Sequence, residues 1–384
     1  MKFNTVKLGE YLYIKGRIGW KGLKKKEYLD KSDFRIINGE SLTENGIDWN
    51  KAGYISKERY DESPEIMLQP DDILISKDGT IGKIGYIDSL NTPTTVASGI
   101  FVIRNQKPEI INTRFIYHFF CSKYFKNFIT MRTEGSVIPH LYQKDFVDLD
   151  FPLPELSVQD KIVGILDAIC NKIDLNKSIN ENLYDQMLTI FNNARDTASW
   201  NRRKLSDVLT FFDNLRKPLS SIQREKMEHI YPYYGATSIV DYVEDYLFEG
   251  TYILVSEDGA NVVDPAGHPL TQYTHGKFWV NNHAHIVKGT NGYSEALVYA
   301  LLGTLNMQSI VTGAAQPKIN QANLRNFEAV LPESNEAQEL SNILNPMLQQ
   351  MILNDQENER LSALRDTLLP QLMSGLFDIS GIEL

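Results

Sequence analysis

The sequence predicts an α+β protein that is built twice, from two similar modules of mixed helix and strand that are each followed by a long helix. Two observations carry this prediction. A segment with glycine, proline and apolar residues in fixed places occurs twice, and each copy leads into a long run with the apolar spacing of a helix. The 384 residues are enough for two or three domains. We expect the two helices to pair as an antiparallel coiled coil with pseudo-twofold symmetry.

The repeated segment runs from Gly135 to Pro154 in the first copy and, 178 residues later, from Gly313 to Pro332 in the second. Within it, Pro139 corresponds to Pro317. We expect these glycines and prolines to shape the junction between each module and its helix.

Upstream of this segment the similarity is weaker but keeps its order. "VKLGEYL" at 6–12 resembles "RKLSDVL" at 203–209, and "DDILISKDG" at 71–79 resembles "YILVSEDG" at 252–259. The second pair is typical of a strand that ends in a turn. The predicted domains are a first module, a first helix, a second module, a second helix and a C-terminal tail, at 1–154, 155–198, 199–332, 333–377 and 378–384.

Both helices carry a heptad seam that two asparagines interrupt at matching positions. These are Asn176 and Asn180 in the first helix, and Asn354 and Asn358 in the second. In an antiparallel pair, Asn176 would face Asn358 and Asn180 would face Asn354. Buried polar residues on such a seam fix its register at some cost in stability. The alternative, two unrelated solvated helices, leaves the matched asparagines unexplained.

The net charge of −10 hides an uneven distribution. The stretch 15–31 holds seven basic and two acidic residues, whereas 331–384 holds two basic and nine acidic residues. An acidic total therefore does not exclude a local surface that binds phosphate. We find no signal peptide and no membrane-spanning run, and the two cysteines favour a cytoplasmic protein without a disulfide framework.

With these features the chain resembles the specificity subunit of Type I restriction-modification systems. The resemblance rests on the paired Gly-x-x-x-Pro segments before long helices, on "YPYYGAT" at 231–237 and on the "SKDG" and "SEDG" turns. It implies a host-defence protein whose two target recognition domains each read half of a split, asymmetric sequence in double-stranded DNA. It also implies that the helices are spacers that dock two methyltransferase subunits, and that two restriction subunits can join.

The resemblance implies no cofactor in this chain. S-adenosylmethionine would belong to the partner methyltransferase, and ATP and Mg to the partner nuclease. Two alternatives stay open: a specificity subunit of a related methyltransferase-only or Type II system, and a protein adaptor that does not bind DNA.

For DNA contact we select basic and aromatic residues in both modules. In the first they are Arg17, Trp20, Lys21, Lys24, Lys25 and Lys77, and in the second they are Arg216, Lys217, Arg224, Tyr233 and Tyr234. For any one of them, a solvated charged face or a core tyrosine is an equal alternative.

We find no catalytic motif and expect no enzyme. An NPPY-like or DPPY-like segment, a G-x-G-x-x-G loop and Walker A spacing are all missing. His275, His283 and His285 could suggest a metal site, but we expect them to be ordinary hydrogen-bonding residues and expect no metal.

Overall fold

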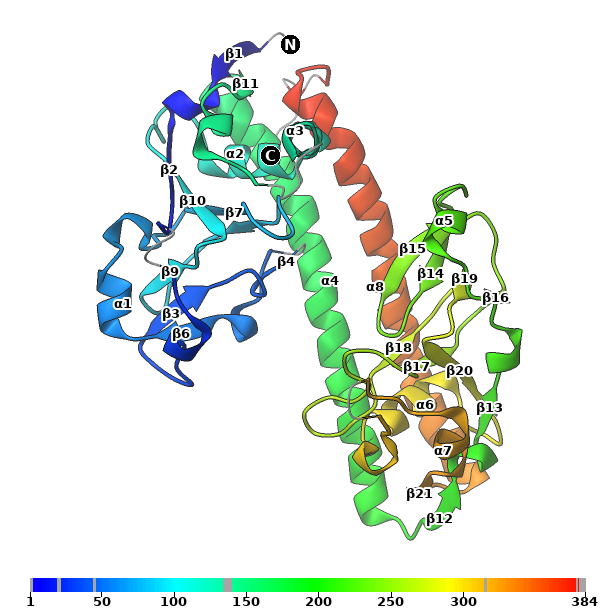
Figure 1. Ribbon diagram of the computed structural model, residues 1–384. Coiled ribbons are helices and arrows are strands. Elements are labelled where there is room, and N and C mark those ends of the chain that lie inside the picture. Colours follow the sequence, from blue (N-terminus) through cyan, green and yellow to red (C-terminus); the bar gives the residue numbers. More distant parts are fainter. Residues whose placement is uncertain are drawn as a thin grey trace. The chain divides into compact units, whose positions relative to one another are not determined.

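The computed structural model describes residues 3–18, 22–43, 46–133, 140–313, 316–377 and 379. The chain divides into two compact units (Figure 1). The first unit comprises Met1–Ile173 and Arg360–Leu384, and the second comprises Asp174–Glu359. Two long helices, α4 (Leu156–Thr197) and α8 (Ser334–Met373), each contribute residues to both units.

The first unit contains a four-stranded antiparallel sheet in the order β2-β10-β7-β8, and a smaller sheet, β6-β3-β9, in which β3 and β9 are parallel. Strand β7 is buried at all four positions, as its apolar run predicts for a central strand. A separate two-stranded ribbon pairs β1 with β11, and β4 pairs with β5. The strands are β1 (Asn4–Lys7), β2 (Leu12–Gly16), β3 (Phe34–Ile37), β4 (Leu42–Thr43), β5 (Gly46–Ile47), β6 (Gly53–Ile55), β7 (Ile73–Ser76), β8 (Ile84–Tyr86), β9 (Thr94–Val96), β10 (Ile100–Asn105) and β11 (Asp150–Leu153). The shorter helices are α1 (Lys57–Asp61), α2 (Thr113–Cys121) and α3 (Lys123–Thr133).

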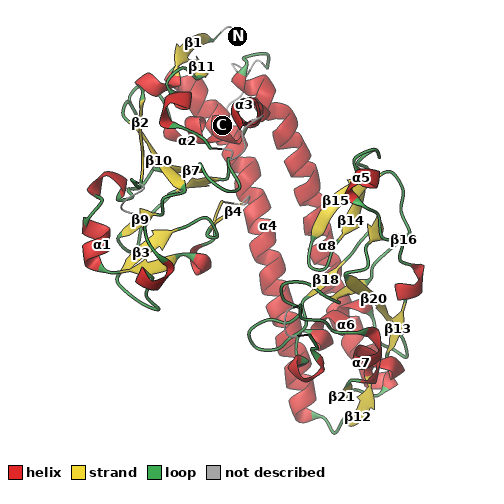
Figure 2. Cartoon of the chain, viewed as in Figure 1, coloured by secondary structure: helices red, strands yellow, loops and turns green. Residues whose placement is uncertain are grey.

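The second unit repeats this plan. Its main antiparallel sheet has the order β13-β20-β17-β18, its second sheet has the order β15-β14-β19-β16 with β14 and β19 parallel, and β12 pairs with β21. Figure 2 shows helix and strand mixed through both units. The strands are β12 (Asn201–Lys204), β13 (Leu209–Phe211), β14 (Tyr231–Tyr234), β15 (Ile239–Val243), β16 (Phe248–Glu249), β17 (Ile253–Ser256), β18 (Thr271–Tyr273), β19 (Lys277–Val280), β20 (Ala284–Gly289) and β21 (Glu328–Leu331). The shorter helices are α5 (Ser221–Arg224), α6 (Glu295–Leu302) and α7 (Gln321–Asn326).

A buried helix follows the main sheet of each unit and begins at a polar cap. The Asn112 side chain accepts from the backbone N–H groups of Arg114 and Phe115 at the start of α2. Ser294 Oγ accepts from Leu297 N at the start of α6. These side chains satisfy donors that the first turn of a helix leaves without a partner, so a polar cap marks where each helix begins.

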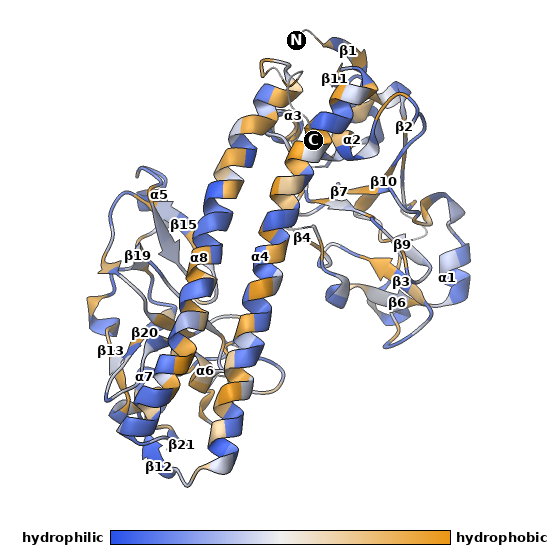
Figure 3. Cartoon of the chain, turned by 180° about the vertical axis from the view of Figure 1, so that it is seen from behind, coloured by the Kyte–Doolittle hydropathy of each residue, from blue (hydrophilic) through white to orange (hydrophobic). Residues whose placement is uncertain are grey.

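Each unit encloses a hydrophobic core to which both long helices contribute. In the first unit, Leu166 of α4 and Leu372 of α8 join the phenylalanines of α2 and α3. In the second unit, Phe191 of α4 and Leu344 of α8 pack with the buried face of α6. Figure 3 shows hydrophobic and hydrophilic residues alternating along both long helices, as an amphipathic pair requires.

The long helices run antiparallel in the second unit, because residue numbers rise along α4 as they fall along α8. Asn176 Nδ2 donates to Asn358 Oδ1 at 2.9 Å, and Asn354 Nδ2 donates to Asn180 Oδ1 at 2.7 Å. The structure thus brings the four asparagines together in the expected pairs; that they fix the register stays a prediction. The predicted fold class, two similar α+β modules followed by long helices that pair, is confirmed. Within the described ranges, no helix is both long and apolar enough to span a bilayer.

Candidate nucleic-acid interface

In the first unit, the repeated glycine–proline segment is hydrogen-bonded to an Asp-Gly turn. Strand β7 ends at Ser76 and continues into Lys77, Asp78 and Gly79. Leu141 N, in the repeated segment, donates to Lys77 O at 3.1 Å. The preceding residue, His140, donates from Nδ1 to Asp78 Oδ1. Gly79 has φ +68°, a backbone conformation that favours glycine. The tight turn therefore explains why glycine occupies this position.

The second unit closes in the same way. Ile319 N donates to Glu257 O at 2.9 Å, just as Leu141 binds the turn of the first unit. Lys318 stands where His140 stands in the first copy, and its Nζ lies 3.0 Å from Glu257 Oε1 and 3.9 Å from Asp258 Oδ2. In both units, therefore, the residue after the repeated proline places a basic group on the aspartate of the turn.

The glycine of the repeated segment has a structural role that can be seen in the second copy. Gly313 has φ +84°, and a Cβ there would lie 2.3 Å from Gln316 O. Only glycine fits this bend without movement. Gly135 and Pro139 of the first copy lie outside the described residues.

A third segment is tied to the main sheet or its connections in each unit. Lys83 Nζ donates to Gly39 O at 3.4 Å, which ties the β7–β8 connection to the link after β3. In the second unit, Gln272 Nε2 donates to Gly235 O at 3.2 Å and ties β18 to the link after β14. We call these segments the loop cluster, defined as 38–41, 77–83 and 140–144 in the first unit and 235–238, 257–261 and 318–320 in the second.

Arg17, selected for DNA contact, is buried in the first unit. Its Nε donates to Val96 O at 3.0 Å, and its Nη atoms lie 3.4 Å from the hydroxyls of Ser63 and Thr95. Burial lowers the pKa of the guanidinium, and the neighbouring Arg59 adds to this effect. A side chain that is 2% exposed does not fit contact with DNA; Arg17 instead holds β9 in place.

The other selected residues of the first unit have different surroundings. Lys24 is exposed, and Lys77 is half-buried in the loop cluster with its Nζ 5.0 Å from the ring centroid of Phe101. Lys25 begins a short 3-10 helix, but its side chain is outside the description, as are Trp20 and Lys21. Contact of Lys24 and Lys77 with DNA stays a prediction.

In the second unit, two selected arginines hold the segment that connects β13 to β14. Arg216 Nη1 lies 2.7 Å from Glu257 Oε2 and donates to Ala284 O at 2.8 Å. Arg224 Nε lies 2.6 Å from Asp241 Oδ2. Both arginines are thus engaged within the protein.

The selected tyrosines of the second unit belong to its interior. Tyr233 and Tyr234 are 2% and 6% exposed, and the Tyr233 hydroxyl accepts from Leu219 N at 2.9 Å. They are core residues, the alternative that their sequence left open. Lys217 differs from them, because its side chain is exposed while Trp279 Nε1 donates to its carbonyl at 2.6 Å. Of the five residues selected here, Lys217 is the one that the structure presents to solvent.

Asp213, Glu257 and His285 have candidate metal-ligand atoms within 4.8 Å of one another. Protein cations already balance these carboxylates, since Arg216 binds Glu257, and Lys318 lies 3.0 Å from the same side chain. Burial favours a higher pKa for Asp213, but the hydrogen bond and charge of His285, the Ile286 N–H and the Arg216 charge together outweigh burial and leave the pKa below its usual value. The cluster ties β17 and β20 to the loop cluster, because His285 Nε2 also donates to the carbonyl of Ile319 at 2.8 Å.

The other histidines considered for a metal site lie apart from this cluster. His283 Nδ1 donates to Asp258 Oδ1 at 2.5 Å, and His275 Nε2 lies 3.9 Å from Glu359 Oε1. His275, His283 and His285 thus each have a different carboxylate partner.

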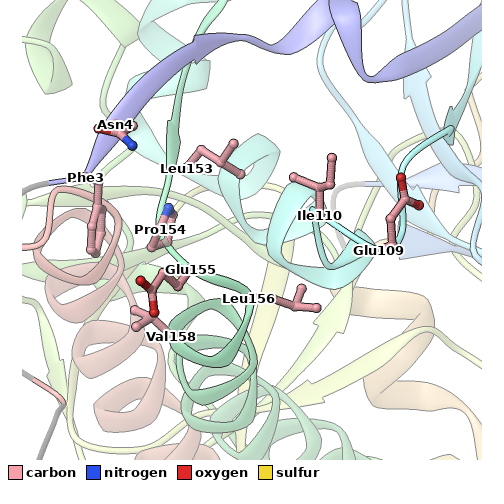
Figure 4. A pocket seen from close by; sticks show the side chains of 9 residues that line it. All are labelled: Phe3, Asn4, Glu109, Ile110, Leu153, Pro154, Glu155, Leu156 and Val158. Carbon is pink, nitrogen blue, oxygen red and sulfur yellow. The ribbon is translucent and has the colours of Figure 1, made fainter.

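A cavity of about 680 Å³ opens at the start of α4 in the first unit. Figure 4 shows two carboxylates among its lining residues, Glu109 from the segment before α2 and Glu155 from the residue before α4. Negative groups in both places oppose the approach of phosphate. This cavity is therefore a poor candidate for binding a nucleic-acid backbone, and the loop cluster is the better one.

The pairing of His140 with Asp78 and of Lys318 with Asp258 was missed by the sequence reasoning. Both the Asp-Gly turns and the repeated segment were visible as repeats, but nothing in their spacing said that they touch. A basic residue directly after the repeated proline in both copies is the signal that could have suggested it.

Comparison with known proteins agrees with this duplicated architecture. The family model for the Type I restriction modification DNA specificity domain matches the chain twice, at residues 2–184 and 198–363. The chain belongs to this family.

Individual relatives are distant. A putative Type I restriction enzyme specificity subunit, S.HindORF215P of Haemophilus influenzae, is 32% identical over 145 residues, which are 38% of this chain and 36% of that protein. The MjaIX specificity subunit of Methanocaldococcus jannaschii is 20% identical over 328 residues, covering 76% of this chain and 75% of that protein. The crystal structure of the Type I S subunit from M. genitalium aligns with a TM-score of 0.54 and 16% identity over 97% of this chain and 96% of that chain, a similarity of fold.

Proposed function

We propose that this specificity subunit reads an asymmetric, bipartite sequence in double-stranded DNA, with each module contacting one half. The observation that supports this most is the repeated topology with different loop clusters. Both units place a basic residue on the aspartate of an Asp-Gly turn, but one uses His140 and the other uses Lys318. Two similar frames with different exposed residues suit two different half-sites, because base-edge contacts carry specificity while phosphate contacts carry affinity.

We propose further that the chain acts in a complex with two methyltransferase subunits, which two restriction subunits can join. The chain itself would supply recognition without catalysis. S-adenosylmethionine would be bound by the methyltransferase, and ATP and Mg by the nuclease. Membership of the family supports this arrangement.

The experiment is to express the chain with its partner methyltransferase in a host without other methylation and to sequence the methylated positions. A split target with two unlike halves supports the proposal. Methylation without a sequence preference, or a single continuous target, would contradict it. A chain that binds a protein partner but leaves DNA unmethylated in every combination would favour the adaptor alternative.

A further inference from the structure

A ridge of three alternating side chains, His140, Tyr142 and Lys144, follows the Asp-Gly turn of the first unit. The ring centroids of His140 and Tyr142 are 4.5 Å apart in an edge arrangement. Lys144 Nζ lies 5.3 Å from the centroid of the Tyr142 ring. The Tyr142 side chain is nonetheless open to solvent, since the residue is 54% exposed. The three side chains therefore pack against one another, while the Tyr142 ring and the Lys144 ammonium group stay accessible to solvent.

The backbone beneath the ridge is fixed. Leu141 and Phe146 are fully buried, so the residues on either side of Tyr142 and Lys144 anchor in the core. Tyr142 N donates to Asp145 Oδ2 at 2.7 Å, and the His140 ring is held by Asp78. A surface that is already ordered loses little conformational entropy on binding, which favours a role in recognition.

The charge of the ridge suits an anionic ligand. Among the residues that the structure describes, neither Lys144 nor the nearby Lys77 forms an ion pair, and each ammonium group instead lies over an aromatic ring. Aromatic faces stack on bases, and lysines neutralise phosphates. DNA offers both partners, whereas an apolar protein surface would leave these lysines desolvated without a counter-charge.

The second unit has no such ridge at the corresponding positions. Lys318 is engaged by Glu257, Asn320 caps α7 by accepting from Asn323 N at 2.8 Å, and Ala322 replaces the lysine. Whatever the ridge does is thus specific to the first unit.

We propose that the ridge of the first unit is a DNA contact that helps to select the half-site read by that unit. Tyr142 and His140 meet bases or sugars, and Lys144 and Lys77 meet phosphates. This inference rests on the proposed function, because it names the residues by which one module performs it.

The test uses the complete chain assembled with its methyltransferase subunits, and a duplex that carries the target found by sequencing methylated positions. Tyr142→Ala and Lys144→Gln are compared with Tyr124→Ala and Lys126→Gln. Tyr124 is also 54% exposed, and Lys126 is exposed on α3, so the controls remove similar side chains elsewhere in the same unit. All four side chains lie on the surface, and circular dichroism checks that each variant folds.

We expect Tyr142→Ala to weaken binding about five-fold or more, as loss of an aromatic stack does. Lys144→Gln should reduce the slope of log affinity against log salt by about 0.9, the value for one phosphate contact. Tyr142→Ala should also relax methylation at one half of the target, whereas Lys144→Gln should weaken binding without changing target choice, and the controls should do neither.

Two results would overturn the inference while leaving the proposed function intact. One is unchanged affinity and target choice in both ridge variants. The other is loss of methyltransferase association by the ridge variants, which would make the ridge a protein contact. If the unaltered complex itself shows no sequence preference, the proposed function fails as well.

Discussion

Replacing Asn180 by leucine tests the role of the paired asparagines in the second unit. Asn180 Nδ2 donates to Asp355 Oδ1 at 2.9 Å and to Met351 O at 3.2 Å, while its Oδ1 accepts from Asn354. Leucine makes none of these bonds, so it leaves the Asn354 amide and the Asp355 carboxylate short of partners in a buried place.

The expected cost follows from the groups left behind. A buried polar group that loses its partner costs about 1–3 kcal/mol, so two such groups cost about 2–6 kcal/mol. For a unit of this size, each kcal/mol lowers the melting temperature by roughly 2–4 °C. The transition of the second unit should therefore fall by roughly 4–24 °C in Asn180→Leu.

The double variant Asn180→Leu/Asn354→Leu distinguishes loss of the hydrogen bond between the two asparagines from a destabilising effect of leucine at either position alone. It places two apolar side chains opposite each other, so it should recover part of the loss and show a coupling free energy of about 1–2 kcal/mol. Asn182 is exposed on the same helix, and Asn182→Leu should change stability by less than about 0.5 kcal/mol. Scanning calorimetry of the full chain measures all of these. Additive losses in the double variant would refute the reasoning, as would a loss in Asn182→Leu equal to that in Asn180→Leu.

Three other predictions concern burial, pH and catalysis. Arg17→Met should destabilise the first unit by about 3 kcal/mol, because it leaves buried acceptors without donors, and should leave the DNA affinity of the folded fraction unchanged. Urea titration measures the stability, and a binding assay measures the affinity. A fully stable variant with weakened binding would contradict this prediction. Burial raises the pKa of Asp355, so its charge destabilises the folded state at neutral pH and this penalty disappears as pH falls through the raised pKa. Asp355→Asn should thus be more favourable, relative to the unaltered chain, at pH 7.5 than at pH 4.5 in melting experiments; a difference that does not change with pH would count against the assignment. The purified chain should transfer no methyl groups from S-adenosylmethionine to DNA until a methyltransferase subunit is added, and transfer by the chain alone in a radiolabel assay would contradict a purely recognising role.

The architecture could be predicted because its signals are periodic or repeated. The heptad seam interrupted at Asn176 and Asn354 indicates paired helices from spacing alone, and the structure places these residues in that pair of helices. Duplication of the glycine–proline segment likewise predicts two modules, because a repeated sequence folds into a repeated structure.

The candidate site could be predicted only in part, because exposure depends on tertiary packing. Arg17 and Lys24 belong to the same basic stretch, yet one is buried against β9 and the other is exposed. Tyr233 is among the residues selected for DNA contact, but it is buried in the core. The contact of His140 with Asp78 joins segments that are 62 residues apart in the sequence, and no local sequence pattern predicts a contact across such a separation.

Exchange of one module tests the central claim most directly. Residues 201–331 would be replaced by the matching module of a relative with a known target, and the methylated positions would be sequenced in cells that also contain the partner methyltransferase. The account predicts that one half of the target changes to the relative's half while the other half stays as it was. A target that changes in both halves, or in neither, would contradict the claim that the two modules read DNA independently.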